Sequence, residues 1–186
     1  MKLIINIIFY QLCWFACILG GAYQLPLLGV AIVALAAVYH LYSAQRMRAE
    51  LVLLAVAAVI GGVWDSLLVS AGWLVYPSGT LLEGTAPYWI VALWISFATT
   101  FNVSLRWFKQ RLALAALFGA VGGPLAFLAG ERLGGVTFTS YPAALAALAL
   151  GWALLMPLML LIAQRYNGFD EPATAAAATA TVEQGS

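Results

Sequence analysis

Asp65 is the clearest candidate for chemistry in this sequence, because it is an ionisable residue deep inside an apolar stretch, GGVWDSLLV. A carboxylate inside a bilayer costs a few kcal/mol on insertion scales, so such a residue is a functional candidate by default. Counting from Glu50 at 1.5 Å per residue places it about 22 Å into a hydrocarbon core about 30 Å thick. It shares a helix face with Ala58, Gly61 and Gly72, so we expect it to face protein rather than lipid.

Two roles fit this carboxylate. In the first it is a packing anchor, hydrogen-bonded to a neighbouring helix or paired with Arg132, whose long side chain can reach down from the same membrane face. In the second it belongs to a binding site. The candidate binding residues are Asp65, Arg132, Gly123, Pro124, Trp64 and Trp94.

The run Gly122-Gly123-Pro124 lies near the middle of a later apolar segment. Proline removes one backbone donor and crowds the preceding turn, so we expect the helix to kink or to be interrupted there. An interruption would make Pro124 the first residue of a half-helix whose partly positive end suits an anion. A kink alone would only improve packing.

Catalytic, redox and metal chemistry are not expected from this sequence. Cys13 and Cys17 are four residues apart on one helix, which disfavours a disulfide, and a single histidine, His40, makes a metal cage improbable. No nucleophile stands beside a base and no phosphate-binding loop occurs, so an enzyme is disfavoured and no cofactor is expected. The amides of Asn6 and Asn102, with His40, are expected to make hydrogen bonds between helices.

The composition defines the elements that position these residues. Of 186 residues, 65% are apolar and 8% charged, against about 25% charged in soluble domains, and the mean hydropathy is +0.98. This excludes a soluble fold and predicts an all-α, polytopic bundle of six transmembrane helices. The predicted segments are Leu3 to Ala22, Leu25 to Tyr42, Glu50 to Trp73, Pro87 to Trp107, Leu112 to Gly130 and Pro142 to Arg165.

One domain, 1–165, should hold all six helices. The remainder, 166–186, is rich in Ala and Thr and is predicted to be a disordered cytoplasmic tail. The first segment could alternatively be a cleaved signal peptide, but its length and its Asn6 and Gln11 favour a retained helix.

Basic residues predict the orientation, because cytoplasmic loops retain Lys and Arg. One side carries seven of the eight: Lys2, Arg46, Arg48, Arg106, Lys109, Arg111 and Arg165. The other side carries Arg132, with Glu83 and Glu131. Both termini are therefore predicted to be cytoplasmic. An aromatic band on the outer side is predicted to lie at the headgroup level: Trp73, Tyr76, Tyr88, Trp89 and Tyr141. The net charge of +1 and the lack of a basic cluster exclude nucleic acid as a partner.

The sequence also resembles a known family. The resemblance covers residues 3 to 165 and is carried by Trp64-Asp65, by Pro87-x-Trp89 with Leu93-Trp94, and above all by Gly119-x-x-Gly122-Gly123-Pro124. That family is an uncharacterised one of small bacterial inner-membrane proteins, catalogued as a domain of unknown function. The resemblance implies a multi-pass inner-membrane protein and a setting near envelope lipid modification. It supplies no catalytic residues.

Three functions remain open on the sequence alone. The leading hypothesis is an inner-membrane protein whose Asp65 region opens toward the outer leaflet and contacts a lipid or other amphiphile, in lipid handling or beside a lipid-modifying enzyme. The second is a small-solute transporter or a membrane-embedded substrate-binding subunit. The third is a structural membrane partner.

Overall fold

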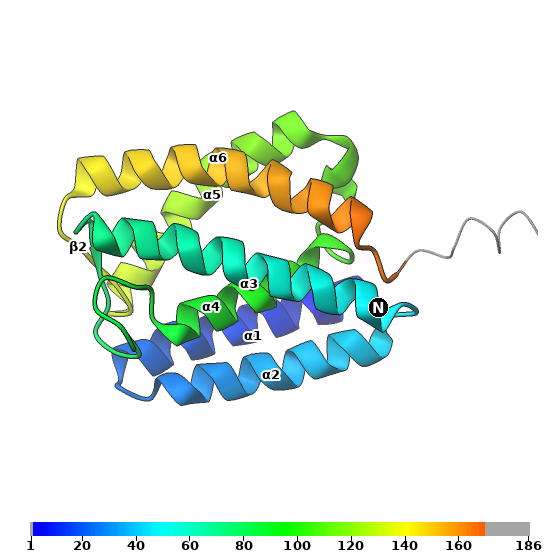
Figure 1. The fold of residues 1–186 in the computed structure, drawn as a ribbon, viewed down its shortest axis with the longest axis horizontal. Helices are drawn as coiled ribbons and strands as arrows, with labels where there is room; N and C mark the ends of the chain where they lie inside the picture. The colour runs from blue at the N-terminus through cyan, green and yellow to red at the C-terminus, as the bar shows by residue number, and fades with distance from the viewer. Residues whose placement is uncertain (1, 170–186) are drawn as a thin grey trace, which may run out of the picture.

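A computed structural model describes residues 2–169 as a helical bundle whose six α-helices run alternately between two ends (Figure 1). The helices are α1 (Lys2–Ala22), α2 (Pro26–Ser43), α3 (Met47–Ser70), α4 (Tyr88–Phe101), α5 (Leu112–Arg132) and α6 (Tyr141–Arg165). The predicted all-α class is confirmed. The predicted tail lies mostly outside the described residues, but its first four residues, 166–169, are folded against the bundle.

Five of these helices, α1, α2, α3, α5 and α6, have 18–25 residues and are apolar enough to cross a membrane. The fourth, α4, has 14 residues, which corresponds to about 21 Å at 1.5 Å per residue. The prediction of a sixth membrane-length helix reaching Trp107 was therefore wrong. The chain leaves the helix at Asn102 and continues as a short 3₁₀ helix, η1 (Arg106–Gln110).

Local hydrogen bonds weaken the helix just before this end, and a distant partner of Asn102 completes it. The hydroxyl groups of Thr99 and Thr100 donate to the carbonyl oxygens three residues earlier, of Ser96 and Phe97, and such bonds compete with helical ones. The Asn102 amide then turns toward α3 rather than continuing the helix. Helix α4 does not need to reach both membrane surfaces, because it lies at the centre of the bundle.

The central position of α4 shows in its contacts and its burial. It packs against α1, α2, α3 and α6, and nine of its 14 residues are buried. Among them is Trp89, whose indole is fully buried and donates to the Ser78 carbonyl oxygen, so the ring contacts protein rather than lipid head groups. Its position at the headgroup level stays a prediction. The short helix α4 thus forms the core of the bundle, and α1, α2, α3 and α6 pack around it.

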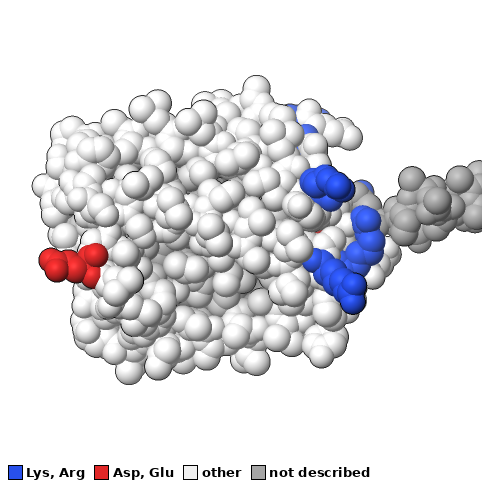
Figure 2. Space-filling view, viewed as in Figure 1, with Lys and Arg blue, Asp and Glu red and all other residues white. Residues whose placement is uncertain are grey.

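Charge divides the molecule into two ends (Figure 2). We call one the basic end; it comprises residues 44–46, 102–111 and 166–169 with the adjoining helix ends. The opposite loop end comprises 23–25, 71–87 and 133–140, and it includes the short antiparallel strands β1 (Leu74–Val75) and β2 (Thr137–Phe138). Figure 2 shows a broad uncharged surface between the two ends, which is the surface that lipid would cover.

Candidate functional site

Asp65 lies on α3 and is completely buried within the bundle. Its Oδ2 accepts a hydrogen bond of 2.6 Å from the indole Nε1 of Trp94, and its Oδ1 accepts a longer one of 3.4 Å from the Tyr76 hydroxyl. The prediction that this residue faces protein is confirmed. Its polar partners are both neutral donors.

Arg132 is not one of these partners. It is exposed at the end of α5, and among residues 2–169 the structure shows no ion pair between it and Asp65. The reason is the arrangement of the helices: α3 packs on α4, α6 and α2 rather than on α5. The predicted pair of Asp65 with Arg132 is therefore absent, and Trp94 takes the place that the arginine was expected to fill.

Tyr76 reaches Asp65 from the loop after β1. Burial raises the pKa of the Tyr76 phenol well above its usual value, and the neighbouring carboxylate raises it further. The hydroxyl therefore keeps its proton and remains a donor to Asp65. The same ring packs edge-on against Trp89, which fixes its direction.

Glycines on α3 and α5 make room for the aromatic rings beside Asp65. A Cβ at Gly61 would overlap the ring of Trp94, and a Cβ at Gly123 would overlap the ring of Trp152. The close contacts expected at these small residues are confirmed. Because both rings lie against helix backbone, they can stack on each other, with centroids 4.9 Å apart and planes 11° apart.

A third indole ring also packs against a glycine. The ring of Trp64 lies against Gly151 of α6, where any Cβ would overlap it. The Nε1 atoms of Trp64 and Trp152 are buried and have no hydrogen-bond acceptor among the described residues. Buried indole N–H groups usually find a partner, so these two donors are exceptions.

A cleft leads from the side of the bundle to this aromatic group. Helices α1 and α5 barely touch, and two adjoining cavities lie between them with α4 and α6 behind. The cavity next to Asp65 has about 60 Å³, and the one nearer the basic end has about 350 Å³. Four residues line both: Tyr10, Phe97, Ala126 and Trp152. We call the combined space the lateral cleft.

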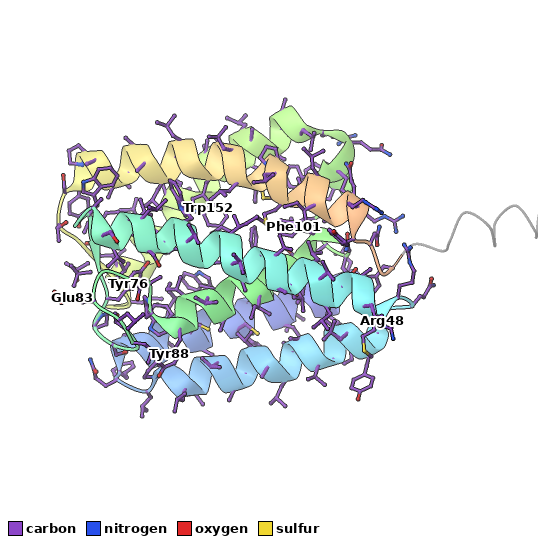
Figure 3. The ribbon with its side chains drawn as sticks, viewed as in Figure 1. Arg48, Tyr76, Glu83, Tyr88, Phe101 and Trp152 are labelled. Atoms are coloured by element: carbon purple, nitrogen blue, oxygen red, sulfur yellow. The ribbon has the colours of Figure 1, made fainter. Side chains whose placement is uncertain are left out.

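The lateral cleft opens on the lipid-facing side of the bundle. Ile7 on α1 and Phe118 on α5 line it and are also 44% and 49% exposed on the outer surface. Its walls are almost entirely apolar or aromatic. Figure 3 shows Trp152, which lines both cavities, near the middle of the bundle and Tyr76 toward the loop end.

Three of the six predicted binding residues line this cleft, namely Asp65, Trp94 and Gly123. The other three do not: Trp64 packs behind it, and Pro124 and Arg132 are not among its walls. Helix α5 runs through Pro124 without interruption, so the alternative of a half-helix with an anion site is wrong. Sequence reasoning missed Trp152 and Tyr10; the signal for Trp152 is its place directly after Gly151 in a stripe of small residues.

A separate polar cluster lies at the basic end around Glu50, another residue whose burial the sequence did not reveal. Its Oε1 accepts from Asn102 Nδ2 and from the Gly168 N–H, both at 2.6 Å, and its Oε2 lies 2.8 Å from His40 Nε2. Lys109 donates to Asn102. The amides do serve between helices, as expected, although Asn6 binds elsewhere, to Thr99 and Ser104. This cluster fastens the segment after α6 to α3.

Metal binding finds no support in the part of the chain that the structure describes. Within residues 2–169, no group of three His, Cys, Asp or Glu side chains comes together in a way that could hold a metal ion. Cys13 and Cys17 are both free and buried. The candidate site is therefore the lateral cleft, with a carboxylate and aromatic rings as its only distinctive groups.

These features define a class: a polytopic helical membrane protein with five membrane-length helices around a short central one and a cleft that opens sideways. Within that class, the chain belongs to the family described as protein of unknown function, DUF2878, which it matches over residues 3–158. The resemblance to an uncharacterised family is thereby confirmed. Comparisons with curated proteins and with solved structures gave no match.

Proposed function

We propose that this protein binds a single amphiphile from the bilayer in the lateral cleft, with the apolar chain between α1 and α5 and the head group toward Asp65. The observation that carries the proposal is the cleft itself. It opens at the lipid-facing residues Ile7 and Phe118, and it ends at a buried carboxylate. A path that begins apolar and ends polar matches the two parts of an amphiphile.

The dimensions of the cleft support a chain rather than a small polar solute. Its larger part, of about 350 Å³, is lined by side chains such as Phe97, Leu105 and Met156 and by the bare backbone at Gly122. Burying an alkyl chain against such walls gains close packing contacts, whereas a water-soluble metabolite would lose its hydration there. This favours lipid handling over transport of a polar solute.

The distribution of charge supports a membrane orientation for this site. The basic end fits the cytoplasmic side, with both termini there, because six helices return the chain to the side on which it began. Asp65 and Tyr76 lie nearer the loop end, so the head group would sit toward the outer leaflet of a bacterial inner membrane. A lipid-modifying enzyme would then be a fitting partner.

Gly122 offers a direct test. A Cβ at this position meets nothing closer than Phe118, at 3.8 Å, so a larger side chain fills the cleft without displacing a packed helix. We expect purified Gly122→Leu to retain several-fold less co-purified lipid in native mass spectra than the wild type. Ala129→Leu, an exposed change on the same helix outside the cleft, is the matched control and should bind normally. Equal retention by all three proteins would overturn the proposal.

A further inference from the structure

The polar end of the lateral cleft carries one negative group and no positive one. Among the described residues that line the two cavities, Asp65 is the sole acidic side chain, and none is Lys, Arg or His. Its two partners, Trp94 and Tyr76, are neutral donors. An anionic head group would therefore face a carboxylate across a medium of low dielectric constant, whereas a cationic one would complement it.

Aromatic rings surround the same end. Seven of them line the part of the cleft next to Asp65: Tyr10, Trp14, Tyr76, Trp94, Phe97, Phe127 and Trp152. The faces of such rings attract ammonium ions, and cages built from several rings bind quaternary ammonium groups. Phe97 lies edge-on to Trp152 and tilted against Tyr10, so the rings form a continuous wall.

The hydrogen bond between Asp65 and Trp94 increases the attraction of the aromatic rings for a cation. The indole N–H that donates to the carboxylate belongs to a ring stacked on Trp152, so the negative charge lies at the edge of this pair of rings. Polarisation along a hydrogen bond raises the electron density of the donor group. The carboxylate itself is fully buried. A cation in the cleft would therefore contact the aromatic rings and be attracted to the carboxylate without touching it.

We infer that the lateral cleft selects an amphiphile whose head group carries an ammonium ion, with the aromatic wall as its contact surface and Asp65 as its counter-charge. The inference rests on the proposed function, because it specifies the head group of the amphiphile that the cleft takes.

Binding of three probes to the full-length protein tests the inference. Dodecyltrimethylammonium and dodecyl sulfate share a chain and differ in head charge, and tetramethylammonium supplies the head without the chain. In native mass spectra of protein held in a glycoside detergent, we expect the wild type to bind dodecyltrimethylammonium at least about tenfold more tightly than dodecyl sulfate. Tetramethylammonium alone should bind far more weakly.

Substitutions at Asp65 and at Trp152 test whether the carboxylate and the aromatic ring cause the preference for the ammonium probe. Asp65→Asn keeps an oxygen acceptor for Trp94 but removes the charge, and should abolish the tenfold preference; Glu83→Gln removes a charge from the exposed loop end, outside the cleft, and should not. In Trp152→Phe an aromatic face remains, whereas in Trp152→Leu it is lost, so the preference should fall in the order wild type, Phe, Leu. This second series keeps the test available if Asp65→Asn does not fold.

The outcomes separate the two proposals. Equal binding of both dodecyl probes, unchanged in Asp65→Asn, would overturn the ammonium inference while leaving amphiphile binding in place. Binding of neither dodecyl probe would overturn both. If tetramethylammonium bound as tightly as dodecyltrimethylammonium, the cleft would be a site for soluble cations, which contradicts the amphiphile of the proposed function.

Discussion

Trp94 and Asp65 form one buried unit across two helices, because the indole ring of Trp94 lies on the bare backbone of Gly61 and its N–H donates to the carboxylate one helical turn further along α3. The two requirements are linked. A ring that could not lie against Gly61 could not place its Nε1 within 2.6 Å of Asp65. The glycine therefore positions the polar end of the cleft as well as the helix contact.

Gly61→Ala should accordingly destabilise the protein. The added methyl group would overlap the Trp94 ring, and overpacking of this kind costs about 1–3 kcal/mol. Gly62→Ala is the matched control, since its Cβ would meet one methyl group of Val91 at 3.3 Å. Thermal unfolding of both variants in one detergent measures the difference. Equal melting temperatures would contradict the close contact at Gly61.

On α5, two adjacent glycines should respond in opposite ways. Gly123→Leu would drive a side chain into Trp152 and should lower the melting temperature strongly, whereas Gly122→Leu should fold normally and lose amphiphile binding. Leu117→Ala, at a position 61% exposed to lipid, should change the stability little. If Gly123→Leu and Leu117→Ala melted at similar temperatures, backbone contact between α5 and α6 would not hold the bundle together.

A double-mutant cycle can distinguish the two candidate partners of Asp65. Asp65→Asn combined with Trp94→Phe should be non-additive by about 0.5–3 kcal/mol, because the first change replaces the charged acceptor of this hydrogen bond by a neutral one and the second removes its donor. Asp65→Asn combined with Arg132→Gln should be additive, since Arg132 is exposed and does not contact Asp65. Coupling in the arginine cycle, with none in the tryptophan cycle, would reverse this assignment.

How far the sequence predicts this molecule depends on the range of the interactions. Helix positions and the packing role of Gly61 and Gly123 follow from local composition and four-residue spacing, which are properties of single segments. The partners of Asp65 do not, because they depend on which helices become neighbours. Sequence reasoning chose Arg132 for its charge, whereas the fold brings the neutral donors Trp94 and Tyr76.

The short central helix escaped prediction for a related reason. Its apolar run continues to Trp107, and nothing local forces an end at Phe101. The end is fixed by the partners that Asn102 finds on α3 and after α6, Glu50 and the Tyr166 carbonyl oxygen. The cleft likewise depends on the gap between α1 and α5, which no single segment encodes.

The cluster at the basic end should contribute strongly to stability. Glu50 is fully buried and accepts hydrogen bonds from Asn102 and the Gly168 N–H while contacting His40. Glu50→Ala would leave the buried donors of Asn102 and Gly168 without this acceptor, and each buried donor left unsatisfied costs about 1–3 kcal/mol. Glu83→Ala, an exposed acidic residue at the loop end, should cost almost nothing. Comparable melting temperatures for the two variants would show that the cluster is not a structural clamp.

The orientation in the membrane is open to labelling with an impermeant maleimide, since the native Cys13 and Cys17 are free but buried and should stay unreactive. Leu82 is 70% exposed at the loop end, and Gln110 is exposed at the basic end. Because basic residues remain in the cytoplasm, Leu82→Cys should react in intact bacterial cells, and Gln110→Cys should react only after the cells are opened.

Reporter fusions give an independent measure of the same orientation. A reporter at Ser186 should show a cytoplasmic signal and one in the Ser78 loop a periplasmic signal, because an even number of helices places both termini on one side. A periplasmic Ser186 together with labelling of Gln110→Cys in intact cells would invert the orientation. The head-group end of the cleft would then face the inner leaflet, and an ammonium-bearing amphiphile would have to be recognised from the cytoplasmic side.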